Sequence, residues 1–288
     1  MNIAVTYMSG SGNLFTVIDG RNYNFSPKEL SKLAKFLCHS NQFNGVRTEG
    51  LIVIQESKDE KVDFDVDFFN PDGSSGMMCG NGGRCAIFYT NKHKITKNKE
   101  LKFRFSGKIY SGRITDKIEI EFEPPKEIRT VSIDINGRNY NGTFVNVGTE
   151  HFVLEIKANT PDSFYKLDIS NLGKLIRNHS YFAPKGTNAN FYLEWNGKIL
   201  LRTYERGVEA ETGACGTGAI STILAYQKNN TTKSITEVIP TSKIPVWVEI
   251  VRSGEQIEKI ILSGPAEIIG SQEVILPDNF MEIEARIG

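Results

Sequence analysis

The feature that most constrains this chain is a short element that occurs twice, once in each half. Residues 78–83 read M-C-G-N-G-G and residues 214–219 read A-C-G-T-G-A, so a cysteine precedes a glycine-rich turn in both places. Apolar residues follow the second element at helical spacing, at Ile220, Ile223 and Leu224. We therefore expect each cysteine in a turn at the N-terminus of a helix, in equivalent places of two related halves.

A helix N-terminus favours negative charge, because its first backbone N–H groups have no partners within the helix and its dipole is positive there. A cysteine in this position is expected to have a lowered pKa, and the same N–H groups can hold a carboxylate. A packed, buried cysteine would explain one copy of the element. Two equivalent copies make that explanation weak.

Three other kinds of site fit the two elements poorly. A phosphate-binding loop needs Gly-Lys-Ser/Thr or a complete Gly-x-Gly-x-x-Gly pattern, and neither element has one. Zinc would need a second pair of ligands beside Cys79 and Cys85, so we expect no metal. A Cys–His hydrolase would leave one cysteine without a role.

Two poised thiols suit the inversion of a carbon stereocentre. One thiolate removes a proton from one face of the carbon, and one thiol delivers a proton to the opposite face. Two helix N-termini directed at the α-carboxylate would stabilise the carbanion-like transition state. No lysine stands out as a Schiff-base site, so we expect no cofactor.

The composition excludes several other classes of protein. In 288 residues, 34 basic and 34 acidic side chains cancel, so nucleic acid and an anionic membrane surface are not expected partners. The apolar runs are too short to cross a bilayer and the N-terminus lacks the features of a signal peptide, so we expect a cytoplasmic protein. Four cysteines are too few for a disulfide scaffold in a chain of this length.

The residue patterns predict an α+β fold with many short antiparallel strands and few helices. Alternating residues at 62–68 and 117–123 indicate strands with one solvated face, and Asn136-Gly137 and Asn196-Gly197 indicate two-residue hairpin turns. Ser26-Pro27-Lys28-Glu29 predicts a capping box at the start of a helix.

The best candidate for a domain boundary is Pro124-Pro125-Lys126, which leaves one cysteine element on each side.

Distinctive motifs run nearly from end to end of the chain. They are G-S-G-N-L-F at 10–15, F-N-P-D-G-S at 69–74, M-C-G-N-G-G-R-C at 78–85, G-T-E-H-F-V at 148–153, G-T-N-A-N-F at 186–191, Y-E-R-G at 204–207 and A-C-G-T-G-A at 214–219. Together these motifs resemble the diaminopimelate epimerase family of cofactor-independent, two-cysteine amino-acid racemases.

The resemblance implies two pseudo-symmetric domains, each a barrel-like, mostly antiparallel sheet around a central helix. The N-terminal domain would comprise residues 1–124 with a C-terminal strand at 272–288, and the second domain would comprise residues 125–271. Such proteins usually pair as homodimers.

The resemblance also implies a role for each matching residue. Cys79 and Cys215 would be the catalytic acid–base pair, and His151 and Glu205 would tune the pKa values of the thiols. The substrate-binding positions would be Asn13, Asn70, Gly80, Asn81, Thr149, Asn188, Glu205, Arg206, Gly216 and Thr217. Considered without the motifs, His151 would more often be structural than catalytic, and Asn13 and Asn70 could be turn formers that bind no ligand.

The implied activity is the interconversion of LL- and meso-diaminopimelate, an amino-acid substrate, in lysine and peptidoglycan precursor synthesis. Two departures from the family pattern question the substrate fit. Thr149-Glu150 stands where Asn-Pro is usual, and Arg47 replaces a glycine. A racemase of the same fold with another substrate therefore remains open, as does a catalytically idle binding homologue.

Overall fold

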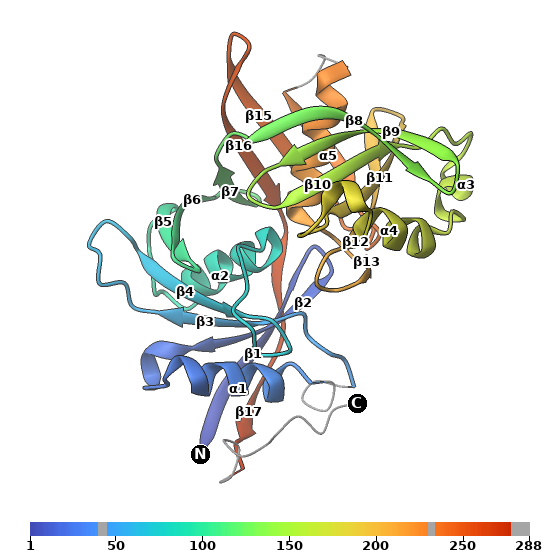
Figure 1. Ribbon diagram of the computed structural model, residues 1–288. Helices are drawn as coiled ribbons and strands as arrows, with labels where there is room; N and C mark the ends of the chain where they lie inside the picture. Colours follow the sequence, from blue (N-terminus) through green and yellow to red (C-terminus); the bar gives the residue numbers. More distant parts are fainter. Residues whose placement is uncertain (40–44, 230–233, 278–288) are drawn as a thin grey trace. The chain divides into compact units, whose positions relative to one another are not determined.

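The computed structural model describes residues 1–39, 45–229 and 234–277 (Figure 1). The chain forms two compact units. The N-terminal unit comprises Met1–Ile120 together with the segment from Gly264, and the C-terminal unit comprises Glu121–Ser263. Most strand pairs in both units are antiparallel and helices are few, so the α+β fold expected from the sequence is confirmed.

The N-terminal unit is built on a sheet whose first strand pairs with the last strand of the chain. Its strands are β1 (Asn2–Gly10), β2 (Asn13–Asp19), β3 (Leu51–Gln55), β4 (Phe64–Phe69), β5 (Glu100–Phe105), β6 (Lys108–Ile114), β7 (Ile118–Phe122) and β17 (Ala266–Ile275). Its helices are η1 (Gly20–Asn22), α1 (Pro27–Leu37) and α2 (Gly80–Lys92). Figure 1 shows β17 running beside β1, as their antiparallel register requires.

The C-terminal unit has the same kind of construction. Its strands are β8 (Glu127–Ile135), β9 (Arg138–Asn146), β10 (Glu150–Glu155), β11 (Asn188–Trp195), β12 (Lys198–Glu205), β13 (Ala210–Thr212), β14 (Ile235–Ile239), β15 (Val246–Ser253) and β16 (Gln256–Gly264). Its helices are α3 (Pro161–Tyr165), α4 (Ile169–Arg177), η3 (Ser180–Phe182) and α5 (Gly216–Asn229).

The order of strand pairing is repeated between the units. From β1 to β6 the successive pairs are antiparallel, parallel, antiparallel, parallel and antiparallel. The same order runs from β9 through β10, β11, β12 and β14 to β15. A parallel pair needs a crossover connection, usually a helix. The second crossover contains α2 in the N-terminal unit and α5 in the C-terminal unit, so these helices are topological equivalents.

Both crossover helices are buried on nearly every side. In α2, residues 80–87 are all buried, and in α5, residues 218–225 are all buried. A helix buried all round lies in a core rather than at a surface. The other crossover helix of each unit packs on the opposite face of the strands. Leu30, Leu33 and Leu37 of α1 belong to a cluster with apolar residues of β1, β2, β3 and β17.

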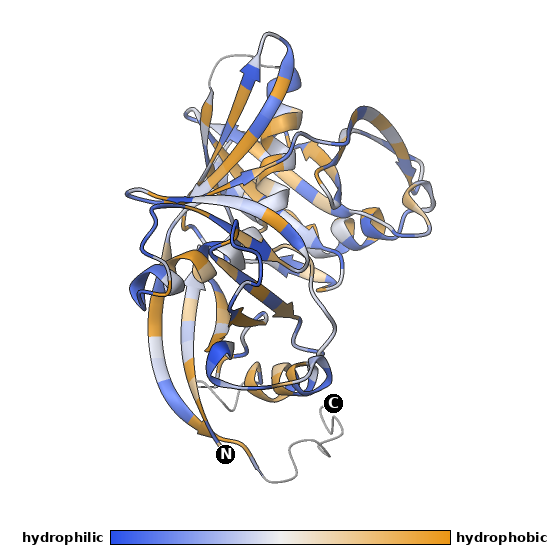
Figure 2. Cartoon of the chain, turned by 90° about the vertical axis from the view of Figure 1, so that its left-hand side faces the viewer, coloured by the Kyte–Doolittle hydropathy of each residue, from blue (hydrophilic) through white to orange (hydrophobic). Residues whose placement is uncertain are grey.

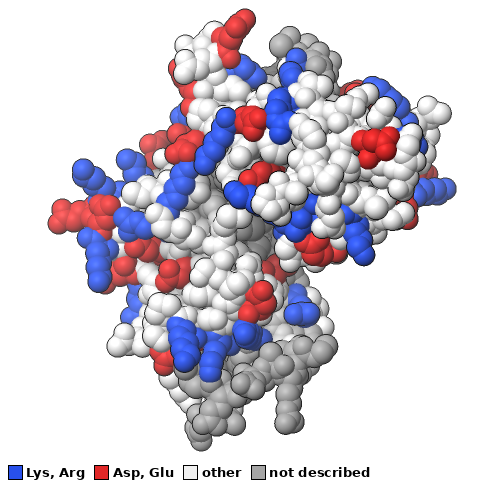
Figure 3. Space-filling view, viewed as in Figure 1, with Lys and Arg blue, Asp and Glu red and all other residues white. Residues whose placement is uncertain are grey.

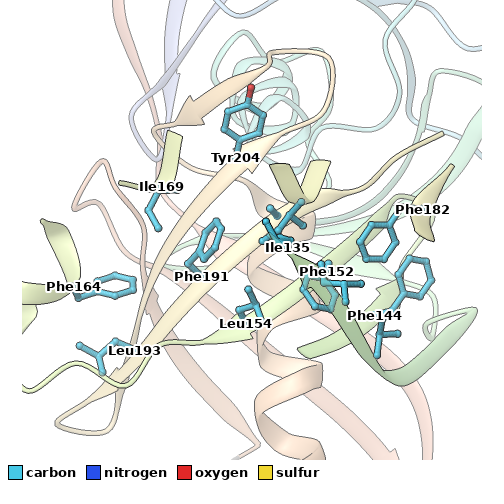
Figure 4. Packing of buried hydrophobic residues seen from close by; sticks show 14 of the residues in the cluster. Ile135, Phe144, Phe152, Leu154, Phe164, Ile169, Phe182, Phe191, Leu193 and Tyr204 are labelled. Atoms are coloured by element: carbon cyan, nitrogen blue, oxygen red, sulfur yellow. The ribbon is translucent and has the colours of Figure 1, made fainter. Parts of the chain in front are cut away.

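The corresponding outer cluster of the C-terminal unit is aromatic. Phe152 of β10, Phe191 of β11 and Tyr204 of β12 pack with Phe164 of α3 and Ile169 of α4 (Figure 4). Side chains alternate between the faces of a strand, so the neighbours of these residues point to the face that α5 covers. Figure 2 shows the alternation as hydrophilic and hydrophobic segments that succeed one another along the strands.

Several local predictions are confirmed. Ser26 and Glu29 form the capping box at the start of α1, which has proline in its first turn. Asn136-Gly137 and Asn196-Gly197 are the two-residue turns of the β8–β9 and β11–β12 hairpins. All four of these turn residues have positive φ, between 52° and 80°, as the tight hairpin turn requires.

The unit boundaries differ from the domain boundaries that the sequence suggested. The units divide at 120/121 and 263/264, in place of 124/125 and 271/272. The expected boundary at 271/272 falls inside β17, whose pairing with β1 begins at Ala266. The strand therefore joins the N-terminal unit from its first residue. Residues 278–288 of the expected C-terminal strand lie outside the described residues.

Acidic and basic side chains are interspersed on the face shown in Figure 3. This agrees with the balanced composition of the chain. Among the helices in the described ranges, none is long and apolar enough to span a membrane.

Candidate active site

Each of the two cysteine elements begins a central helix. Cys79 is the N-cap of α2 in extended conformation, and its carbonyl accepts from the Gly83 amide at 2.8 Å. Cys215 directly precedes α5, and its carbonyl accepts from the Ala219 amide at 2.9 Å. The side chain of Cys79 is partly exposed, and Cys215 is 9% exposed. Gly80 and Gly216 directly follow the cysteines as the first helical residues, where backbone N–H groups have no partner within the helix.

In the N-terminal unit, the β1–β2 turn packs closely on the first turn of α2. A Cβ on Gly10 would lie 2.6 Å from the Asn81 carbonyl oxygen, so only glycine permits this approach. Ser11, in the turn, has φ of 53° and is buried. Its hydroxyl accepts a hydrogen bond from Arg84 at 2.8 Å, and the Asn81 side-chain oxygen accepts from the same arginine nitrogen at 2.8 Å.

The two other predicted residues of this unit occupy different surroundings. Asn13 opens β2 and is 3% exposed. Asn70 follows β4 in a turn, where its amide nitrogen donates to the Ser74 hydroxyl at 2.9 Å and its carbonyl accepts from Gly73. The structure thus gives Asn70 the turn-forming part that an Asn-Pro-Asp-Gly stretch favours.

The remaining two cysteines are buried and inaccessible to solvent. Cys38 and Cys85 are at most 1% exposed. Burial raises the pKa of Cys38 to about 11 and raises the pKa of Cys85 as well. Both stay protonated at neutral pH and can serve as controls for the two helix-terminal thiols.

In the C-terminal unit, strand register brings the polar residues together beneath α5. His151 of β10 is in register with Asn188 of β11, and Asn190 is in register with Thr203 of β12. Each of these four residues is next in sequence to a member of the outer aromatic cluster, and side chains alternate between the two faces of a strand. The four polar side chains therefore lie on the α5 face. A Cβ on Gly218 of α5 would lie 2.6 Å from the Asn190 side-chain oxygen.

His151 is fully buried in a network of neutral groups. Its Nδ1 lies 3.0 Å from the Asn190 amide nitrogen, and the Asn190 oxygen accepts from the Thr203 hydroxyl at 3.0 Å. With the amide oriented in this way, Nδ1 accepts and Nε2 carries the proton. Nε2 is 2.9 Å from the Thr149 hydroxyl and 3.1 Å from the Thr217 hydroxyl. Burial lowers the pKa of His151 to about 3, so the imidazole is neutral near pH 7.

The Cys215 thiol lies among three polar partners. The Gly218 amide donates to its sulfur at 3.4 Å, and the Thr217 hydroxyl lies 3.6 Å from the sulfur. Glu205 accepts hydrogen bonds from the Thr212 hydroxyl and from Cys215. Burial raises the pKa of Glu205, although both hydrogen bonds favour its charged form. Cys215 therefore contacts both a carboxyl group and a hydroxyl that is linked to His151.

Arg206 is held in an ion pair that the sequence did not indicate. Its Nη1 donates to the Glu150 carboxylate at 2.9 Å and to the Gly186 carbonyl at 3.2 Å. The Asn188 side chain joins the two partners, since its amide nitrogen donates to the Glu150 carbonyl and its oxygen accepts from the Arg206 amide, both at 2.9 Å. Lys185 lies 3.7 Å from the same carboxylate.

The predicted residues of the C-terminal unit fall into two hydrogen-bonded sets. One set contains Thr149, His151, Thr217, Cys215 and Glu205, and the other contains Asn188 and Arg206 with Glu150. Gly216 is the first residue of α5. Sequence reasoning missed four polar residues that hold the predicted ones, namely Arg84, Glu150, Asn190 and Thr212. Arg84, Glu150 and Asn190 lay inside the quoted motifs, and that position was the available signal. Arg84 and Asn190 are both fully buried. Within the described ranges, no group of three or more His, Cys, Asp or Glu residues could hold a metal ion.

Comparison with known proteins gives consistent matches. A family described as diaminopimelate epimerase matches residues 5–138. Diaminopimelate epimerase of Hydrogenobaculum sp. (strain Y04AAS1) is 36% identical over 272 residues, which cover 91% of this chain and 94% of that protein. Diaminopimelate epimerase of Aquifex aeolicus (strain VF5) is 33% identical over 268 residues, which cover 89% and 92%.

Solved structures share the fold at low sequence identity. A PhzF-family phenazine biosynthesis protein of Bacillus anthracis has a TM-score of 0.74 and 14% identity, and the match covers 96% of this chain and 100% of that one. A hydroxyproline epimerase of Agrobacterium vitis, with bound trans-4-hydroxy-L-proline, has a TM-score of 0.71 and 12% identity, with coverage of 96% and 93%.

Proposed function

Because the chain belongs to the diaminopimelate epimerase family and is an isomerase, we propose that it interconverts LL- and meso-diaminopimelate through two thiols, Cys79 and Cys215. The reaction supplies precursors for lysine and peptidoglycan. The observation that carries the proposal is the paired placement of these thiols, since each directly precedes the central helix of a unit with the same strand order.

The chemistry uses both thiols in one turnover. A thiolate takes the α-proton, so the Cα–H bond breaks and an S–H bond forms. The second thiol gives its proton to the opposite face of the carbon, so its S–H bond breaks and a new Cα–H bond forms. The two cysteines end with their protonation states exchanged. The former base then loses its proton to water and the former acid takes one from water, which restores the pair for the next turnover.

The helix N-termini suit the stabilisation of the intermediate charge. The N–H groups that follow Cys79, at Gly80 and Asn81, and those that follow Cys215, at Gly216 and Thr217, are the groups proposed to bind the reacting carboxylate. Fixed donors of this kind act where negative charge develops in the transition state. His151 is neutral and linked to Thr217, which supports a role in orienting the hydroxyl beside Cys215.

Asn13, Asn70, Thr149, Asn188, Glu205 and Arg206 are proposed to bind the rest of the substrate. Arg206 provides a guanidinium for the distal carboxylate, because its planar fork matches a carboxylate. Asn188 supports this role, since its side chain fixes the backbone of Arg206. Glu205 contacts Cys215, which favours a part in setting the protonation of that thiol.

One observation favours a second candidate function, a racemase of the same fold for another amino acid. Arg206 is already paired with Glu150, a residue that stands where the family usually has proline. A substrate without a distal carboxylate would leave this pair undisturbed. Lysine and proline, which lack a distal carboxylate, therefore belong in the substrate panel beside diaminopimelate. Glutamate, whose side chain ends in a carboxylate, completes the panel. We expect diaminopimelate to be preferred by about 10⁴-fold, because buried polar groups left unpaired penalise smaller substrates.

Exchange with heavy water tests the proposal directly. The purified full chain should introduce deuterium at the α-carbon of diaminopimelate as it inverts that carbon. Cys79→Ala and Cys215→Ala should each lower inversion by at least about 10³-fold, since each removes the proton carrier of one face. Cys38→Ala and Cys85→Ala are matched controls and should keep near wild-type turnover. Inversion at the wild-type rate in either active-site variant would exclude the two-thiol mechanism.

A cytoplasmic location and a homodimer complete the proposal. The small amino-acid substrate and balanced charge are consistent with a cytoplasmic enzyme. Sedimentation of the purified chain should give twice the monomer mass of 32.2 kDa. A monomer at micromolar concentration would contradict the proposed assembly.

A further inference from the structure

Arg84 is an unusual residue in the N-terminal unit, because it is a large cation with no exposed surface. It is 0% exposed and lies in the second turn of α2. Its Nε and Nη1 atoms have no hydrogen-bond partner, and within the described part of the chain it makes no ion pair with Asp or Glu. Burying a charge without compensation is strongly destabilising, so a charge of this kind normally has a partner or a function.

The side chain of Arg84 is held by neutral oxygens on two different segments. One nitrogen, Nη2, donates to the Ser11 hydroxyl and to the Asn81 side-chain oxygen, each at 2.8 Å. Ser11 belongs to the β1–β2 turn that ends at Asn13, and Asn81 belongs to the α2 turn that begins at Cys79. Arg84 thus ties together two segments that carry proposed substrate-binding and proton-transfer residues.

The charged groups around Arg84 leave one candidate for its counter-charge. Burial lowers the pKa of Arg84 to about 10, while Cys85 and Cys79 act to raise it, so the guanidinium stays charged near pH 7. Cys85 remains a thiol because burial raises its pKa. Glu267 of β17 acts on Cys85 but is exposed to solvent, which screens it. Cys79 is the partly exposed thiol of this group.

We propose that Arg84 is a positioning residue for Cys79: its buried guanidinium is the counter-charge of the Cys79 thiolate and joins the Ser11 turn to the first turn of α2. Arg84 acts through Cys79 and Asn81 and is not itself a proton carrier. The inference rests on the proposed role of Cys79 in proton transfer. It adds to the proposed site a residue, Arg84, that does not itself contact the substrate.

Alkylation of Cys79 tests the charge without any turnover, so its outcome is separate from that of the proposed function. The full chain with Cys215→Ala is treated with iodoacetamide from pH 5.5 to 9.5, and the Cys79 peptide is quantified by mass spectrometry. Arg84→Gln should move the midpoint of the rate profile upward by about one pH unit, which is about tenfold in rate below both midpoints. Arg84→Lys should move it less, because the cation is kept.

Two controls separate charge from folding. Arg104→Gln removes an arginine of β5 that pairs with Asp65 at 2.8 Å, and it should leave the Cys79 midpoint unchanged. Ser11→Gly removes one acceptor of Arg84 and keeps a residue that tolerates positive φ. It should lower the thermal midpoint while the alkylation midpoint stays near that of the parent.

A second measurement needs no Arg84 variant and can still overturn the proposal if Arg84→Gln does not fold. A thiolate stabilised in the folded state releases its proton at lower pH than the unfolded thiol, whose ordinary value is about 8.5. The urea midpoint of the wild type, relative to Cys79→Ala, should therefore rise as pH increases from about 6.5 to 8.5. A flat difference, or an unchanged alkylation midpoint in folded Arg84→Gln, would overturn the proposal.

Discussion

Replacing Glu150 with glutamine should strengthen diaminopimelate binding, because the Glu150 carboxylate occupies the guanidinium proposed for the distal carboxylate of the substrate. Arg206 donates to Glu150 at 2.9 Å, and the two side chains are 19% and 18% exposed. The ion pair is therefore mostly buried but still partly accessible to solvent. At an effective dielectric constant of about 20, charges 4 Å apart attract by about 4 kcal/mol before desolvation is subtracted.

Only part of this attraction opposes the substrate. A hydrogen bond to a charged group contributes about 1.5–3 kcal/mol net, and the neutral glutamine keeps some of that bond. Lys185, 75% exposed, adds a second and weaker partner to the same carboxylate. We take about 1.4 kcal/mol as the competition removed by Glu150→Gln, which corresponds to a tenfold lower KM. The value of kcat should change little, because the substitution lies away from the reacting carbon.

The assay is steady-state epimerisation, with binding measured separately by calorimetry in a Cys79→Ala background, since KM equals a dissociation constant only when chemistry is slow. Glu237→Gln is the matched control, because Glu237 pairs with Lys198 at 3.0 Å on the outside of the proposed site. The gain should disappear when Arg206→Met is added. An unchanged or higher KM in Glu150→Gln would refute the view that the two carboxylates compete for Arg206.

Four further expectations follow from the same structure. Thr149→Asn should lower KM about fivefold by restoring roughly 1 kcal/mol of hydrogen bonding, and an altered substrate preference in the panel would contradict this. The pH profile of kcat should be bell-shaped and should keep both limbs in His151→Gln, because the limbs belong to the thiols and the pKa of His151 is about 3; loss of a limb would assign it to the imidazole. The unfolded imidazole of His151 binds a proton near pH 6.5, whereas the folded one does not. Acidification from pH 7.5 to 5 should therefore lower the unfolding free energy of the wild type in urea by about 2 kcal/mol more than that of His151→Gln, and equal losses would show that the imidazole titrates normally. The raised pKa of Glu205 has the opposite effect on stability, but it is present in both proteins and cancels from the comparison. Ser26→Ala should lower stability by about 1 kcal/mol without changing kcat, as a thermal melt and a rate measurement will show, because Ser26 caps α1 far along the chain from either thiol.

The features that could be read from the sequence are those that a few adjacent residues determine. The capping box needs only Ser26 and Glu29, and a hairpin turn needs only the positive φ that Asn136 and Gly137 adopt readily. The positions of the two thiols are also determined locally. A cysteine that is followed by a glycine turn and an apolar helix lies at the N-terminus of that helix, whatever the helix packs against. The pairing of the two elements suggested proton transfer by the thiols, and the family resemblance supplied the substrate and the roles of the other site residues.

The partners of the site residues depended on contacts between distant segments. Arg84 reaches Ser11 across 73 positions of the chain, and His151 meets Thr217 across 66. Arg206 reaches Glu150 across 56 positions, and the Asn188 side chain bonds to the backbone of both. Such contacts follow from strand register, and a shift of one residue would turn the polar side chains to the apolar face. The position of each thiol at a helix N-terminus was therefore determined by local sequence. The charges and hydrogen bonds around each thiol were determined only by the packing of the strands on α2 and α5 in the folded units.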